Sequence, residues 1–409
     1  MHNCFHAGDI LIPQGISMKK WACVACDQFS SQPEYWDRVS QYVGDAPSTL
    51  HMIFPEAYLR RGAGEDRLFA IHETMDRYLA DGLFRTLRRS FVYLERTLPS
   101  GLVRRGLVGQ VDLEDYDFTP GSGSIIRATE GTVLDRIPPR KKLLEGAKLE
   151  FPHVLLLCDD RKDAIMPAAR EAKSEQLYSF DLMEEGGHIV GWAVSGMGVS
   201  LVNAAITDYI HAVTSSQENN SSMAFAVGDG NHSLASAKAC WEEIKPTLSG
   251  AALLEHPARY ALVELENIHD PAIVFEPIHR VISGIRTEHF MKALETICVP
   301  NGYPVTVVTG SGEKTVCLDT RESPLAVAIL QPFLDRYTSS YGGSMDYIHG
   351  ENAVISLAGR PDTVGLILPG MEKTALFPGV IQGGVLPRKT FSMGEAREKR
   401  YYLEGKKRQ

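Results

Sequence analysis

The sequence has 409 residues, of which 44% are hydrophobic and 23% are charged, and its net charge is −9. We expect an ordinary soluble globular protein with two domains, or one large domain with insertions. The acidic balance argues against broad electrostatic binding to nucleic acid. No run reaches the roughly 18 apolar residues of a membrane span, and the N-terminus lacks the basic and apolar segments of a secretion signal.

The seven cysteines are an odd number and are scattered along the chain, mostly inside or beside apolar runs. This usage favours reduced, buried thiols over a disulfide framework, and therefore a cytoplasmic location. Cys23 and Cys26 form one CxxC motif without a second pair. Because structural zinc usually takes four ligands, we interpret these two residues as packing residues.

The first half of the chain combines predicted strands and helices, which favours an α/β fold. Apolar spacing predicts amphipathic helices over 31–43 and 66–82, followed by strands at "SFVYLERTL" and "RRGLVGQVDL". Pro138 and Pro139 suit the first turn of a further helix. After a buried strand, "FPHVLLLCDD", we expect a helix at 163–178, a strand at 188–194 and an apolar helix at 200–214.

The second half changes character after about residue 285. Before that point the pattern predicts the buried strand "MAFAV", a helix over 232–244 and the strand "ARYALVELENI". Beyond it a smaller α+β region is expected, with helices at 288–297 and 323–337 and strands at 303–309, 314–319 and 364–368. The last segment, rich in basic residues and tyrosine, is expected to pack back on the rest. We divide the chain into 1–285, with an insertion at about 151–220, and 286–409.

The stretch "FAVGDGNHSLAS", residues 225–236, joins a buried strand to a helix through a sharp corner. This arrangement presents backbone N–H groups to an anion. Gly228 and Gly230 would allow positive φ and the close approach of a ligand. Asp229 suits a magnesium ion or a hydroxyl group, and Asn231 or His232 would cap the helix or touch a phosphate. The alternative is a capped helix start without a ligand.

A second stretch, "RATEGTVLDRIPPRKK", places the carboxylate of Glu130 on a loop between basic residues. Arg127 and Arg140 suit phosphate clamping. A carboxylate there would accept the proton of a substrate hydroxyl, the role of the base in phosphoryl transfer. On spacing alone, a solvated charged turn is the favoured alternative. Lys389, in "LPRKTFSMG", would add positive charge to a phosphate site or anchor the C-terminus.

Both stretches resemble the motifs of the bacterial and archaeal family called domain of unknown function 1015, DUF1015. The first motif corresponds to Thr129-Glu130-Gly131-Thr132 with Arg140 at the later arginine position, and the second to Asp229-Gly230-Asn231-His232-Ser233. The stretches "ARYALVELENIHDPAIVFEPIHRVI" and "GGVLPRKTFSMGEAREKRYYLE" also look like this family. The resemblance covers nearly the whole chain.

The paired motifs are also similar to those of the free serine kinases of the ParB/sulfiredoxin superfamily. The resemblance implies a mixed-sheet ParB/sulfiredoxin-like core with N-terminal and C-terminal α+β elaborations. Thr129 stands where the family has histidine, and Ser233 where it has arginine. The implied catalytic residues are Glu130 as base, Asp229 as metal or substrate contact, and His232. The implied nucleotide-binding residues are Gly228, Gly230, Asn231, Ser233, Arg127, Thr132, Arg140 and Lys389.

The function that this resemblance implies is magnesium-dependent phosphoryl transfer from ATP or ADP to a small hydroxylated metabolite, with free L-serine as the leading acceptor. One alternative is a nucleotide-binding switch or other binding protein without catalysis. Nucleic-acid processing is a third, which the acidic charge disfavours. The expected partners are a nucleotide and a small molecule, with no membrane. The oligomeric state stays open, with a homodimer as one alternative.

Overall fold

The computed structural model describes residues 3–61, 64–132, 137–216, 223–319 and 325–408. It divides the chain into two compact units. The first unit comprises Met1–Ala128, Thr132–Ile273 and Glu395–Gln409, and the second comprises Thr129–Gly131 and Val274–Gly394. The chain therefore leaves the first unit, builds the second and returns. Our division near residue 285, with its insertion, stays a prediction about domains.

The first unit is built on a mixed sheet that has eleven strands among the described residues. Its main path is β10 (Gln176–Asp181), β11 (His188–Val194), β4 (Phe84–Thr97), β5 (Val103–Asp112), β13 (Tyr260–Asn267), β9 (Leu155–Cys158), β12 (Phe225–Asp229), β7 (Ile126–Ala128) and β6 (Tyr116–Asp117). In addition, β1 (Phe5–His6) pairs with β5, and β2 (Gly8–Pro13) pairs with β4. Strand β12 runs parallel to β7 and antiparallel to β9. The mixed α/β architecture predicted from the sequence is confirmed.

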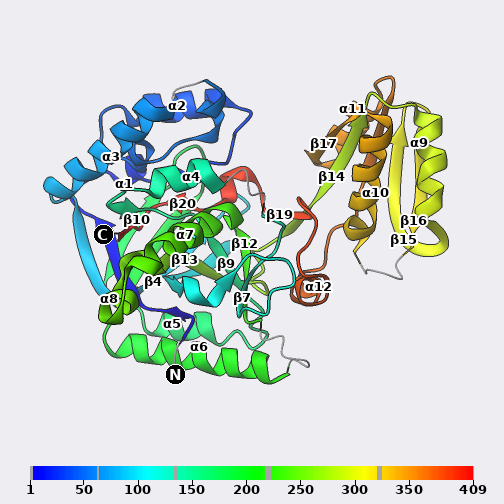
Figure 1. Ribbon diagram of the computed structural model, residues 1–409. Helices are drawn as coiled ribbons and strands as arrows, with labels where there is room; N and C mark the ends of the chain where they lie inside the picture. The colour runs from blue at the N-terminus through cyan, green and yellow to red at the C-terminus, as the bar shows by residue number, and fades with distance from the viewer. Residues whose placement is uncertain (1–2, 62–63, 133–136, 217–222, 320–324, 409) are drawn as a thin grey trace. The chain divides into compact units, whose positions relative to one another are not determined.

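Alternation along the strands gives this sheet two apolar faces. One face, which carries Tyr93, Phe225 and Val263, packs against α5 (Ile165–Glu171), α6 (Met197–Ser216) and α7 (Asn231–Ile244). The other face, which carries Val92 and Leu262, packs against α1 (Met18–Trp21), α2 (Pro33–Val43) and α3 (Gly64–Ala80). Helices α4 (Ile137–Leu144) and α8 (Gly250–Glu255) complete this unit in Figure 1.

Residues 395–408 form a C-terminal arm that returns to the first unit. Within it, β20 (Tyr401–Tyr402) pairs with β3 (Cys23–Val24), and β21 (Lys406–Lys407) pairs with β8 (Leu149–Glu150). Between them, Gly405 exchanges backbone hydrogen bonds with Leu11 of β2. The expectation that the last segment packs back is confirmed.

The second unit is an α+β unit with an antiparallel sheet. Its strand order is β16 (Gly312–Leu318), β15 (Cys298–Thr309), β18 (Thr363–Ile367), β14 (Phe275–Ser283) and β17 (Ser344–His349), with β19 (Phe391–Met393) paired to β14. Its helices are α9 (Thr287–Leu294), α10 (Ala326–Tyr341), α11 (Glu351–Ala358) and α12 (Leu376–Gly383). The α+β character expected for this part of the sequence is confirmed.

One predicted helix, over 163–178, is wrong in its second half. Helix α5 ends at Glu171, and β10 follows at Gln176. In β10, Tyr178 and Phe180 are buried, while Ser179 and Asp181 are exposed. This alternation with a period of two is that of a strand and not of a helix. Across the described residues, no helix combines the length and the apolarity needed to span a membrane.

Candidate functional site

The corner at residues 225–236 is a strand, a glycine turn and a helix, as predicted. Strand β12 ends at Asp229, Gly230 adopts the left-handed conformation with φ of 80°, and α7 begins at Asn231. A Cβ atom on Gly230 would lie 3.0 Å from the Cα atom of Val154. Positive φ and this close approach both require glycine here, which fixes the direction of the helix N-terminus.

Two details of the corner differ from the sequence prediction. Gly228 lies inside β12 and is not among the glycines with positive φ, so only Gly230 has the predicted conformation. The N-cap position is held by Gly230 without a side-chain hydrogen bond, so neither Asn231 nor His232 caps the helix. Asn231 instead donates from Nδ2 to the carbonyl oxygen of Val227 at 3.4 Å. The glycine of the turn therefore occupies the N-cap position, and the expected side-chain cap is absent.

Asp229 lies beside a lysine that the sequence analysis did not identify. Oδ2 of Asp229 is 3.5 Å from Nζ of Lys399, and Oδ1 accepts the backbone N–H of Gly230 at 3.0 Å. Lys399 belongs to the C-terminal arm and is buried. The arm therefore brings a positive charge to the corner, at the end of the helix where an anion is favoured.

His153 connects the first turn of α7 to the arm. Its Nε2 atom lies 3.3 Å from Oγ of Ser233, and its Nδ1 atom lies 2.7 Å from the hydroxyl of Tyr402. Oδ2 of Asp27 is 3.7 Å from the same Nε2 atom. Because Ser233 and Asp27 face one ring nitrogen, the three residues do not form a Ser-His-Asp relay, in which the acid and the serine use opposite nitrogens.

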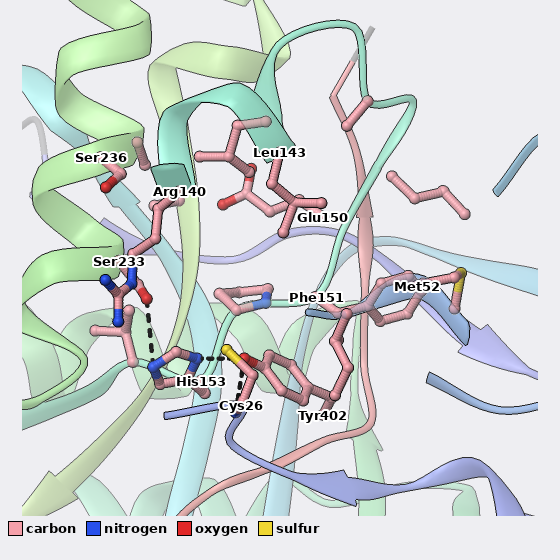
Figure 2. Close-up of a pocket in the computed structure, with 18 of the residues that line it drawn as sticks. Cys26, Met52, Arg140, Leu143, Glu150, Phe151, His153, Ser233, Ser236 and Tyr402 are labelled. Atoms are coloured by element: carbon pink, nitrogen blue, oxygen red, sulfur yellow. Dashed lines mark hydrogen bonds between the residues drawn. The ribbon is translucent and has the colours of Figure 1, made fainter. Parts of the chain in front are cut away.

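A pocket of about 90 Å³ opens beside α7 in the first unit (Figure 2). Arg140 and Ser233, two residues predicted to bind phosphate, both line it. The other polar side chains in its wall are Cys26, Glu150, His153, Ser236 and Tyr402. Arg140 forms an ion pair with Glu56. Burial opposes the charge of Arg140, but Glu56, Cys26, Asp27 and Tyr402 together outweigh it, so the pKa of Arg140 lies above its usual value.

The side chains of Asp27 and Cys26, in the same region, have shifted pKa values. Burial opposes the charge of Asp27, but His153 and Arg140 hold the pKa of that carboxyl below its usual range. Burial and the nearby Asp27 raise the pKa of Cys26 to about 12. Cys26 is therefore a neutral thiol at physiological pH and not a nucleophile, which agrees with its interpretation as a packing residue.

Arg127 and Thr132 lie in the first unit at the ends of the Glu130 motif. Arg127 lies opposite Ala226 in the pairing of β7 with β12, and its Nε atom donates to the carbonyl oxygen of Ser124 at 2.7 Å. Arg127 is buried, and burial lowers its pKa. The role of both residues in nucleotide binding stays a prediction.

Glu130 and Lys389 come together in the second unit. The backbone N–H of Lys389 donates to Oε1 of Glu130 at 3.1 Å, and the N–H of Leu386 donates to the carbonyl oxygen of Thr129 at 2.8 Å. The contact with Glu130 is thus made by the backbone of Lys389. Lys389 has φ of 57°, which is uncommon for a residue with a side chain.

A buried arginine supports the loop that holds Glu130. Arg280 of β14 is fully buried and donates to Oε1 of Gln331 at 3.1 Å and to the carbonyl oxygen of Arg388 at 3.0 Å. Burial lowers the pKa of Arg280 to about 10, although Tyr347 and Glu130 act in the opposite direction. Within the second unit, Arg280 fixes the backbone beside Lys389 and contributes positive charge near the Glu130 carboxylate.

The residues that the sequence analysis missed come from distant parts of the chain. Asp27 and His153 belong to no motif. Lys399 and Tyr402 lie in the last segment, which resembles the family, but only the basic character of that segment hinted at Lys399. For a metal, the described residues contain no group of three or more His, Cys, Asp and Glu side chains. Magnesium is often held by one or two carboxylates together with substrate phosphates, and Asp229 fits that limited role.

The chain belongs to the family described as protein of unknown function, DUF1015, whose model matches residues 12–372. This match confirms the family assignment made from the two motifs. A search of the curated proteins found no match.

Solved structures with a similar arrangement of elements include C-terminally truncated SbnI from Staphylococcus aureus, with a TM-score of 0.38, 10% identity and coverage of 70% of this chain and 82% of that one. A conserved hypothetical protein from Pyrococcus furiosus has a TM-score of 0.35 and 8% identity, over 73% and 93% of the two chains. A free serine kinase in complex with AMP has a TM-score of 0.39 and 9% identity, over 72% and 90%. Overlap at this level carries no argument about the activity of this chain.

Proposed function

We propose that this protein binds a nucleotide with its phosphates at the N-terminus of α7 and transfers a phosphoryl group to a small hydroxylated metabolite. The observation that carries the proposal is the corner itself. Strand β12, the left-handed Gly230 and helix α7 direct the positive end of a helix dipole toward one point. The turn of backbone that Gly230 makes possible suits the close approach of a phosphate.

Three basic side chains surround this point in the first unit. Lys399 lies beside Asp229, His153 lies beside Ser233, and Arg140 shares the pocket wall with Ser233. The positive charges of Lys399 and Arg140 would neutralise phosphate oxygens, both in the bound nucleotide and as charge develops during transfer. They replace the arginine that the related motif has at the position of Ser233.

Two assignments rest on the motifs. Glu130 would accept the proton of the acceptor hydroxyl, as its place in the Thr129–Thr132 motif implies. Asp229 would hold Mg²⁺ together with the nucleotide phosphates, and the ion would neutralise phosphate charge when bound. Free L-serine is the first acceptor to test, with ATP and ADP as the two donors.

The test is phosphorus NMR of the purified protein with Mg²⁺, ATP or ADP, and a mixture of L-serine and related hydroxylated metabolites. We expect a new phosphomonoester signal with the wild-type protein. Because Glu130→Gln removes the base but keeps the size of the side chain, we expect it to reduce the rate by at least about 10²-fold. Glu276→Gln, an exposed position of the same unit, is the matched control and should keep the wild-type rate.

The outcomes separate the alternatives. A phosphomonoester that forms equally fast with Glu130→Gln would show that Glu130 is not the base. Nucleotide binding without any product, for every acceptor, would favour the switch that binds nucleotide without catalysis. The replacement of the motif histidine by Thr129 is the feature of this sequence that favours that second function.

A further inference from the structure

Most of the residues that line the pocket beside α7 are apolar. Helix α7 contributes Leu234 and Ala237, and helix α4 contributes Leu143 and Leu144. Phe151 and Met52 close the side away from α7 and are labelled in Figure 2. Aliphatic and aromatic side chains from several elements thus line the pocket, and they suit a flat, apolar ring that gains dispersion contacts with them.

We propose that this pocket holds the purine ring of the nucleotide. The inference rests on the proposed function and extends it, because it assigns the part of the ligand that the phosphate corner does not recognise. All the residues in the pocket wall belong to the first unit, as does the corner.

The pocket and the phosphate corner are continuous. Ser233 is the third residue of α7, so it belongs to the first turn of the helix and to the pocket wall at once. Arg140 and His153 line the same end of the pocket as Ser233 (Figure 2). A ring bound in this pocket would therefore direct its attached sugar and phosphates toward the positive end of α7.

The volume of the pocket suits one ring system better than a whole nucleotide. A water molecule needs roughly 10–15 Å³ of such space, so about 90 Å³ holds several waters. That is enough for one ring system but not for a whole nucleotide. The phosphates must then lie outside the pocket, which is where the corner would bind them.

Three of the polar side chains in the wall are already bonded within the protein. Glu150 accepts from Arg408 at 2.9 Å, Ser236 donates to the carbonyl oxygen of His232 at 2.7 Å, and Tyr402 bonds to His153. Recognition would therefore depend on shape and apolar area more than on hydrogen bonds to the base. Since a purine offers more area than a pyrimidine, we expect ADP to bind more tightly than CDP.

The test is a substitution that fills the pocket, studied with two ligands that both carry phosphates but of which only one carries a purine ring. Ala237→Leu adds a side chain to the wall of the pocket, where Ala237 is buried. Isothermal titration calorimetry would measure the affinity of the wild-type and variant proteins for ADP and for inorganic tripolyphosphate. The matched control is Ala252→Leu, the same change at an exposed position of α8.

We expect Ala237→Leu to weaken ADP binding by at least tenfold and to leave tripolyphosphate binding unchanged, while Ala252→Leu changes neither. Unchanged ADP binding by Ala237→Leu would overturn the pocket assignment and leave the proposed function intact. Equal loss of both ligands would also overturn it, because the substitution would then be acting on the phosphate corner. If the wild-type protein binds neither ligand, the proposed function itself fails.

A second measurement needs no variant. The wild-type protein would be photolabelled with 2-azido-ADP, with and without excess ADP, and the modified peptides identified by mass spectrometry. ADP-protected labelling in segments 140–154 or 233–237 would support the assignment. Protected labelling confined to other segments would overturn it, even if Ala237→Leu proved too unstable to study.

Discussion

At the scale of single residues, the pairing of Asp229 with Lys399 defines what the corner can bind. Asp229 alone would repel a phosphate at the start of α7. Lys399, which lies 3.5 Å from it and is largely shielded from water, offsets that charge. The corner thus combines the positive helix end with a neutral acid-base pair, and a phosphate or a magnesium–phosphate group can compete for either partner.

Replacing Lys399 tests this arrangement. Hydrogen bonds to charged groups contribute about 1.5–3 kcal/mol, so we expect Lys399→Met to weaken ADP and tripolyphosphate binding about 10- to 100-fold. Lys399→Arg keeps the charge and should retain most of the affinity. Titration calorimetry on both variants checks this, and an unchanged affinity of Lys399→Met would remove Lys399 from the site.

The site was only partly predictable from sequence. Gly230, Asp229 and Ser233 follow one another in the chain, so a local pattern of strand, glycine and helix was enough to place them. His153 precedes Ser233 by 80 residues, and Lys399 follows Asp229 by 170 residues. Sheet pairing and the C-terminal arm bring both side chains to the corner. No local rule encodes such contacts, because they depend on which strands pair.

At the scale of elements, the C-terminal arm is held by buried charges. Arg400 forms ion pairs with Glu264 of β13 and, at 2.5 Å, with Glu404 of the arm. Arg400, Glu264 and Glu404 are all buried. Such pairs cost desolvation free energy when they form. Removing one partner is nevertheless strongly destabilising, because the other charge is left buried without a partner.

The arm should therefore be sensitive to loss of Arg400. We expect Arg400→Met to lower the free energy of unfolding by about 3–5 kcal/mol, because Glu264 and Glu404 lose their shared partner inside the protein. Lys19→Met, which removes the exposed pair with Asp181, is the control and should change stability little. Urea unfolding of both variants measures the two losses of stability. If Arg400→Met and Lys19→Met lowered the free energy of unfolding equally, burial would not explain the importance of the Arg400 ion pairs.

Element prediction worked best where the pattern was long and one-sided. The helices over 33–43 and 64–80, and the strand over 188–194, were placed within two residues because their apolar spacing is regular. The start of the strand after α5 was missed because the predicted helix was extended to Tyr178, the first of its two buried aromatic residues. The pairing of the arm with β3 and β8 could not be predicted from the sequence, because a local pattern shows that a segment is structured but not which segment it contacts.

At the scale of the whole molecule, two fully buried titratable groups of the first unit affect stability in opposite directions. Burial raises the pKa of Glu266 from 4.5 to about 8. Burial also lowers the pKa of Lys406 from 10.5 to about 8, although its Nζ atom donates to the carbonyl oxygen of Pro257 at 2.6 Å. Each group therefore prefers its neutral form in the folded protein.

These two groups predict a minimum of stability near pH 8. Between pH 4.5 and 8 the unfolded chain ionises Glu266 while the folded protein keeps it protonated, so stability falls as pH rises. Between pH 8 and 10.5 the folded protein releases the proton of Lys406 while the unfolded chain keeps it, so stability rises. Glu266→Gln should gain stability relative to wild type across the first interval, and Lys406→Met should lose it across the second.

Urea unfolding at pH 5, 8 and 10 would measure these differences. Comparing each variant with wild type at the same pH removes the contribution of the other titrating groups. Curves that run parallel to wild type at all three values would show that neither group is held neutral in the folded protein.

The return of the arm also sets the order of events during protein synthesis. The first unit needs residues 401–408 to complete the strands β20 and β21, yet these residues leave the ribosome only after the whole second unit has been made. At about 5–20 residues per second, the nascent first unit waits roughly 7–27 s after residue 273 with the edges of β3 and β8 unpaired. During that interval Lys399 is also absent from the corner. A stalled or shortened nascent chain would thus expose these strand edges to chaperones.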